Sequence, residues 1–236
     1  MSEEHEEKGN PVMSFLDKTL KGVRKFLEEK NLLNFTDELT YLGLRKMIDF
    51  LKNTFIPMEI EGKEFIPDFQ PAIITSIVQE PIDLLLATSL TPRKIHFMFP
   101  AKLYESPGMK PILDSIGAFR STKSKDDMEP IQNVIKFINE DQDFVAMIPI
   151  DDGSREKLVK QFAGIIKFAA GIPTHIIPYV GDSIREYTLG NTIRMKVAEP
   201  IKVDKKISRD DRYMLAERII DIILGMKEDL ETKETS

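Results

Sequence analysis

From residue 57 onward, short runs of β-branched and aromatic residues alternate with segments of helical periodicity. The strand-like runs are bounded by Pro, Gly or Asp, as strands commonly are; they are PMEIEG, PAIITSIV, RKIHFMF, DFVAMIPI, THIIPYV and TIRMKVAEPI. The helical segments between them are DLLLATSL, GMKPILDSI, MEPIQNVIKFINE and REKLVKQFAGIIKFAAG. This alternation predicts an α/β fold with a central mixed, largely parallel sheet flanked by helices.

Helical patterns also flank this region on both sides. Residues 1–56 hold an acidic tail and two amphipathic segments, MSFLDKTLKGVRKFLEEKN and DELTYLGLRKMIDFLKNTF, which predict an N-terminal helical pair. In residues 204–236, Ser208 and Asp211 have the spacing of a helix cap, and a C-terminal helix is expected to follow and pack on the same domain. Residues 57–203 are therefore expected to form one α/β domain. The N-terminal helices either pack on it or bind a membrane surface through their basic residues.

The composition excludes several classes of protein. The 236 residues include no cysteine, which excludes disulfides, thiol nucleophiles and thiolate metal sites. A net charge of -6 without a long basic run argues against a nucleic-acid partner. The three histidines, His5, His96 and His175, show no metal-ligand spacing, so neither a metal nor a cofactor is expected, and His96 and His175 are predicted to be structural residues of strands.

The start of the chain is acidic and polar, and no apolar run is long enough to span a bilayer. We therefore expect a cytoplasmic protein. The N-terminal helix is the candidate for peripheral contact with the inner face of the membrane.

Three polar turns follow strand-like runs and are the candidate functional site. They are VQEPID at 78–83, GAFRSTKSK at 117–125 and DDGSR at 151–155. In α/β folds, polar chemistry gathers where strands end and helices begin. The three turns are therefore expected to contribute to one site.

The order of these turns, followed by the strand THIIPYV, resembles the glycerolipid acyltransferase family, which includes lysophosphatidate acyltransferases. The resemblance covers residues 57–203. Family members carry Asn-His, four further residues and Asp, then a block that runs from Gly to Arg, then Phe-Pro-Glu-Gly-Thr-Arg. Here Asp83 matches the family's Asp, while Ile77 and Val78 take the places of Asn and His.

The second and third blocks are closer to the family pattern. Gly117 matches the family's Gly, and Lys123 stands where Arg is expected, which keeps the charge and loses the bidentate fork. The run Asp152, Gly153, Ser154 and Arg155 stands for Glu-Gly-Thr-Arg. The resemblance implies that substrate, including the acceptor's phosphate, is bound by Lys123, Asp152, Gly153, Ser154 and Arg155. For Arg155, a structural salt bridge is an equal alternative.

Val78 is the departure that matters most for chemistry. In the family, the histidine is the general base for the acceptor hydroxyl, and the Asp orients and supports the imidazole. Valine accepts no proton, and the loss of a positioned base costs roughly 10²- to 10⁴-fold in rate. Glu80, in the same turn, is the candidate replacement base. Asp83, with no imidazole to orient, is alternatively a helix N-cap.

Three hypotheses follow, and they leave open whether the protein is an enzyme. In the first, a diverged acyltransferase-like protein has lost or weakened acyl transfer and keeps a groove for an acyl chain or a lipid phosphate. In the second, an active enzyme uses Glu80 as base and moves an acyl group from acyl-CoA or acyl carrier protein to a phosphorylated lipid acceptor. In the third, the chain is an unrelated α/β interaction module, which would be favoured if the three turns lay on different faces of the sheet.

Overall fold

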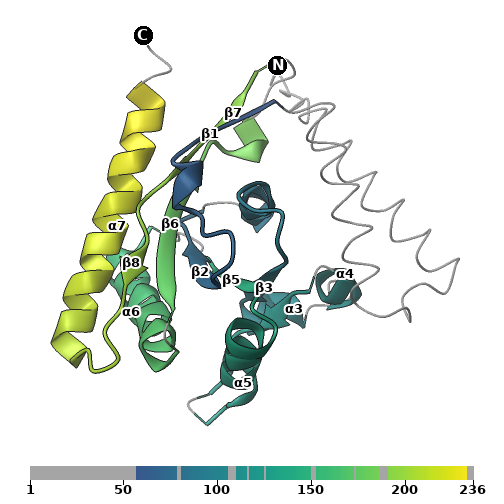
Figure 1. Cartoon of the computed structure of the whole chain (residues 1–236), viewed down its shortest axis with the longest axis vertical. Coiled ribbons are helices and arrows are strands. Elements are labelled where there is room, and N and C mark those ends of the chain that lie inside the picture. Colours follow the sequence, from purple (N-terminus) through teal and green to yellow (C-terminus); the bar gives the residue numbers. More distant parts are fainter. Residues whose placement is uncertain are drawn as a thin grey trace, which may run out of the picture.

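The computed structural model describes residues 57–78, 81–105, 110–115, 117–124, 126–149, 153–172, 174–186 and 191–232. The predicted N-terminal helical pair lies outside these residues. Figure 1 shows a twisted sheet with helices against it, and α7, near the C-terminus, runs along one side. In this part of the chain, no helix is both long and apolar enough to cross a membrane.

The sheet is mixed and largely parallel, as the sequence predicts. Its order within the described residues is β1-β7-β6-β2-β5-β3-β4, and β8 also pairs with β6. The strands are β1 (Met58–Glu61), β2 (Ala72–Thr75), β3 (Ile95–Phe99), β4 (Phe119–Arg120), β5 (Phe144–Met147), β6 (His175–Gly181), β7 (Ile193–Val197) and β8 (Ile201–Lys202). All neighbouring pairs are parallel except β6 with β7 and β6 with β8.

The helical segments connect these strands. They are η2 (Lys63–Phe65), η3 (Pro81–Ser89), α3 (Ala101–Tyr104), α4 (Lys110–Ser115), α5 (Glu129–Ile135), η4 (Lys136–Glu140), α6 (Arg155–Gly171), η5 (Ile184–Glu186) and α7 (Arg209–Thr232). The predicted cap of α7 is present, because the Ser208 hydroxyl accepts a hydrogen bond from the Asp211 N–H at 3.1 Å. The predicted helical segment DLLLATSL lies in a 3₁₀ helix up to Ser89, whereas part of GAFRSTKSK, which is predicted to be a turn, forms β4.

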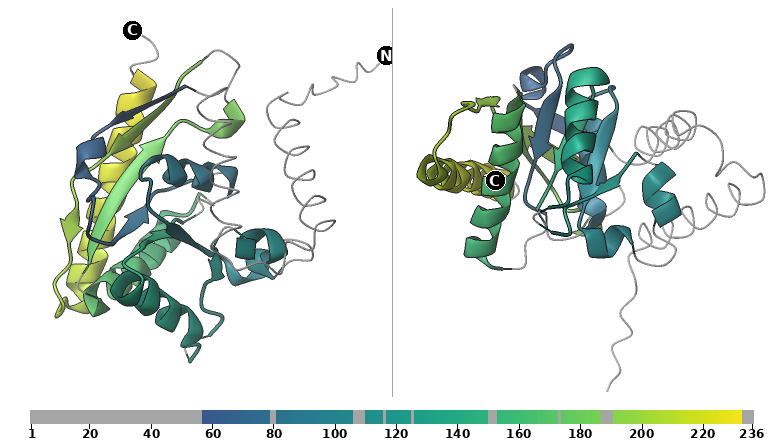
Figure 2. Two further views of the ribbon diagram at one scale, coloured as in Figure 1. Left: turned by 45° about the vertical axis from the view of Figure 1, so that its right-hand side comes forward. Right: turned by 90° about the horizontal axis from the view of Figure 1, so that it is seen from below.

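Each face of the sheet buries its own apolar core, because side chains alternate along a strand. One core joins η3 to strand residues such as Ile74 and Phe97, and the other joins α5, α6 and α7 to residues such as Ile73 and Val145. The helices α6 and α7 pack against each other on the second face, as Figure 2 shows. The inner strands are therefore covered on both faces, which explains their nearly continuous apolar runs.

The three polar turns lie at one edge of the sheet. Strands β2, β3, β4 and β5 are parallel, so their carboxyl ends point the same way. The Val78 N–H donates to the Pro149 carbonyl at 3.2 Å, which joins the first turn directly to the segment that leads into the third. The chain leaves β5 towards β6 and leaves β3 towards β4, in opposite directions, so β5 and β3 flank a topological switch point, where α/β folds bind ligands.

Candidate functional site

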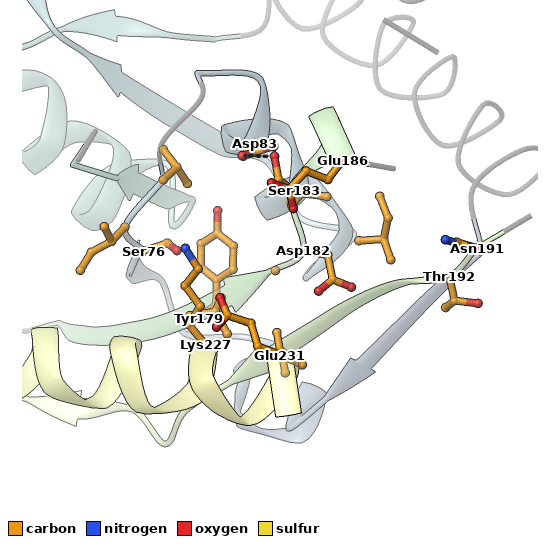
Figure 3. A pocket seen from close by; sticks show the side chains of 17 residues that line it. Ser76, Asp83, Tyr179, Asp182, Ser183, Glu186, Asn191, Thr192, Lys227 and Glu231 are labelled. Atoms are coloured by element: carbon orange, nitrogen blue, oxygen red, sulfur yellow. Dashed lines mark hydrogen bonds between the residues drawn. The ribbon is translucent and has the colours of Figure 1, made fainter. Parts of the chain in front are cut away.

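A cavity of about 360 Å³ opens at the carboxyl ends of β2 and β6. Its walls come from four places: the residues after β2, the end of β6 with η5, the start of β7 and the last turns of α7 (Figure 3). The polar lining residues are Ser76, Asp83, Tyr179, Asp182, Ser183, Glu186, Asn191, Thr192, Lys227 and Glu231. Two residues of the predicted catalytic turn, Val78 and Asp83, are therefore in its wall.

Val78 is buried, with 7% of its surface exposed, and belongs to the core on the η3 face. Its backbone is held by the hydrogen bond to Pro149. Val78 therefore presents to this wall a branched apolar side chain that binds no proton.

Asp83 caps a neighbouring turn. Its carboxylate accepts hydrogen bonds from the Ile184 N–H at 2.8 Å and from the Ser183 hydroxyl at 3.1 Å. The side chain is 6% exposed, so these bonds form in a poorly solvated environment. Asp83 thereby connects η3 to η5, about a hundred positions further along the chain. Sequence spacing gave no sign of this link, because only the parallel pairing of β2 and β6 brings the two segments together.

Tyr179 is a lining residue that the sequence did not single out. It lies on β6 with 1% of its surface exposed, and its hydroxyl has no hydrogen-bond partner among the described residues. Burial, and secondarily the negative charge of Asp83, raise the pKa of Tyr179 well above its ordinary value. The phenol therefore stays protonated and acts as a hydrogen-bond donor.

The two predicted phosphate-binding cations are both paired with carboxylates, and neither lines the cavity. Lys123 forms an ion pair with Glu105. Arg155 bridges to two residues of α7, Glu217 at 2.6 Å and Asp221 at 2.7 Å, and these contacts raise its pKa, Asp221 most strongly. Of the two interpretations of Arg155, the structure contains the salt bridge.

Of the remaining predicted site residues, two have structural roles at the start of α6 and two lie outside the described residues. Gly153 has a positive φ of 81°, a conformation that favours glycine, and Ser154 caps α6 by accepting from the Lys157 N–H at 3.4 Å. Both are therefore needed for the turn that starts α6. Glu80 and Asp152 lie outside the described residues.

Ion pairs of Arg120 organise the second turn. Its guanidinium pairs with Asp127 and with Glu129, the latter at 2.6 Å, and the Lys123 N–H donates to Asp127 at 2.9 Å. These contacts, Arg120 first, lower the pKa of Asp127 from 3.8 to about 2. The side chain of Arg120 is 14% exposed, so the pairing fixes the loop that follows β4.

His96 has the structural surroundings expected from its place in a strand. One ring nitrogen lies 3.1 Å from the Gly117 carbonyl and the other 3.0 Å from Asp143, and the ring stacks on Phe137 at 3.6 Å. Together with Asp141, His96 and Asp143 form a group whose potential metal-ligand atoms lie within 4.8 Å of one another. The sequence missed this group because His96 and Asp143 are 47 positions apart. It does not line the cavity.

Carboxylates dominate the charge of the cavity wall. Asp182 is paired with Arg194 at 3.0 Å, while Glu186 and Glu231 lie at the exposed rim. The one ammonium among the described lining residues is that of Lys227 on α7. Figure 3 shows Lys227 and Glu231 on the same helix, opposite Asp83 and Ser183. Such a wall repels anions and favours groups that donate hydrogen bonds.

Comparisons with known proteins identify the family of the chain and a similar fold. Residues 57–181 match a family model described as Acyltransferase. The fold is similar to the crystal structure of the 1-acyl-sn-glycerophosphate (LPA) acyltransferase PlsC from Thermotoga maritima, with a TM-score of 0.55 and 14% sequence identity. The similarity covers 91% of this chain and 88% of that one. No curated protein sequence matches the chain.

Proposed function

Because the chain belongs to the acyltransferase family, we propose that it is a diverged member that binds an acyl or lipid ligand at the carboxyl edge of its sheet and has lost, or strongly weakened, acyl transfer. The observation that carries this proposal is that Val78, which the sequence resemblance aligns with the family's histidine, is buried in the cavity wall. A family member without that base retains substrate binding as its main capacity.

The surroundings of Val78 support the same conclusion. Asp83 would have to support an imidazole, yet its carboxylate already holds Ile184 and Ser183. Tyr179 is a buried polar residue of β6 in the same cavity wall, and its raised pKa makes it a donor rather than a base. Turnover by the family mechanism would therefore require Glu80, the remaining candidate of the first turn.

The proposed ligands follow from the family and from the fold's likeness. The Thermotoga maritima protein is, by its title, an acyltransferase for 1-acyl-sn-glycerophosphate. For this chain, we accordingly propose an acyl chain, delivered as acyl-CoA or acyl carrier protein, or a lysophospholipid-like molecule at the membrane surface. Binding of a phosphate by Lys123 or Arg155 would require their present ion pairs to open.

Acyl transfer and ligand retention must be measured together to test this proposal. Transfer from labelled long-chain acyl-CoA to lysophosphatidate is followed in the presence of liposomes, and retention of each labelled lipid is measured in parallel. The variant Glu80→Gln removes the candidate base while keeping the size of the side chain. Asp68→Ala, an exposed change outside the cavity lining, serves as the control.

We expect saturable retention of a lipid or acyl donor and no transfer above the uncatalysed rate. Transfer that disappears in Glu80→Gln would overturn the proposal in favour of an enzyme with a replaced base. Absence of both transfer and retention would remove the binding role as well.

A further inference from the structure

The hydroxyl of Tyr179 needs a hydrogen-bond acceptor that the described residues do not supply. Its oxygen is buried and unpaired, although the side chain lies in the wall of a cavity (Figure 3). An unpaired buried hydroxyl destabilises a protein, so such groups usually find a partner in a ligand or an ordered water. The phenol is a donor here, and its partner must offer a lone pair.

The other polar residues of the wall are mostly hydrogen-bond acceptors and therefore require a donor. Asp83 is buried in the wall, Asp182 is partly buried and paired with Arg194, and Glu186 and Glu231 lie at the exposed rim; among the lining residues that the structure describes, only Lys227 carries an ammonium. Carboxylates accept hydrogen bonds and donate none. A ligand at this place must therefore also provide donors, and an added negative charge would be repelled.

A hydroxyl group satisfies both requirements, because it accepts one hydrogen bond and donates another. An ammonium lacks the lone pair that Tyr179 needs, and a phosphate lacks the donors and carries the wrong charge. Building on the proposed function, we infer that the cavity selects an uncharged, hydroxyl-bearing head group over a phosphorylated one. Tyr179 is the positioning residue that donates a hydrogen bond to this hydroxyl.

This assignment separates the head group from the two basic turns. Lys123 and Arg155 lie outside the cavity lining and form ion pairs with carboxylates of the protein. The acceptor class that fits the described residues is an alcohol or polyol attached to an acyl chain.

The test compares two soluble lipids that differ by one phosphate. Binding of 1-hexanoylglycerol and of 1-hexanoylglycerol 3-phosphate to the full chain is measured by isothermal titration calorimetry. Tyr179→Phe removes only the buried hydroxyl, and Tyr213→Phe, on α7 and outside the cavity lining, is the matched control. Thermal unfolding of each variant is recorded in parallel.

We expect the uncharged lipid to bind at least about tenfold more tightly than its phosphate. Tyr179→Phe should weaken binding of the uncharged lipid by about five- to tenfold, while its melting temperature stays equal or rises, because an unpaired hydroxyl has been removed. If Tyr179 had only a structural role, its substitution would not weaken lipid binding while leaving the melting temperature equal or higher. Tyr213→Phe should leave the affinity unchanged.

Tighter binding of the phosphate, or an affinity that Tyr179→Phe leaves unaltered, would overturn the inference and leave the proposed lipid-binding function standing. Binding of neither lipid would overturn both. Transfer of an acyl group to 1-hexanoylglycerol would contradict only the loss of catalysis, and would support the head-group assignment.

Discussion

Asp83 is predicted to be a structural residue, so its removal should lower stability before it affects any chemistry. Asp83→Ala deletes the acceptor of the Ile184 N–H, at 2.8 Å, and of the Ser183 hydroxyl, at 3.1 Å. Ile184 is 7% exposed, so water cannot fully replace the lost carboxylate. A hydrogen bond to a charged group contributes about 1.5–3 kcal/mol. Two donors are affected, but the partly buried Ser183 hydroxyl can turn to water, so we expect a loss of roughly 2–4 kcal/mol in the free energy of unfolding.

The measurement is urea unfolding followed by far-ultraviolet circular dichroism, with thermal unfolding beside it. A loss of this size corresponds to a melting temperature lower by roughly 5–15 °C for a chain of this length. Asp83→Asn keeps one carbonyl acceptor and should lose about half as much, while the exposed Asp68→Ala should stay within about 0.5 kcal/mol of wild type. The reasoning is refuted if Asp83→Ala unfolds like wild type. It is refuted more strongly if this variant keeps the stability of wild type but loses ligand binding or acyl transfer.

Three further changes test other parts of the structure. Arg155→Gln should lower stability by less than about 1 kcal/mol, since its ion pairs are exposed, and urea unfolding should show that the difference shrinks in high salt; a larger, salt-independent loss would contradict this. The depressed pKa of Asp127 adds stability that is present above its ordinary value of 3.8 and is lost as the pH falls towards about 2. The melting temperatures of wild type and Asp127→Asn should therefore converge in acid, and an acid-independent gap would show that the pairing with Arg120 does not cause the effect. Gly62→Ala should cost at least about 1–3 kcal/mol in urea unfolding, because its φ is 77° and the new Cβ would lie 2.3 Å from the Val197 carbonyl oxygen; an unchanged midpoint would refute this.

The fold class and the order of the elements were determined by the sequence itself. Periodicity is local, so the two-residue and 3.6-residue patterns identify strands and helices without knowledge of their neighbours. The predicted cap at Ser208 is local in the same way, and it is present. The family resemblance, also drawn from order and spacing, is confirmed by the match over residues 57–181.

The partners of the site residues were decided only by the tertiary structure. Asp83 meets Ser183 and Ile184 because β2 and β6 are parallel neighbours, and Arg155 meets α7 because α6 and α7 share one face of the sheet. Tyr179 gave no signal in the sequence, since a tyrosine in an apolar strand is ordinary and only a missing partner makes it notable. Contacts between distant segments depend on the order of the strands and on the face of the sheet to which a side chain points. The local spacing of residues determines neither of them.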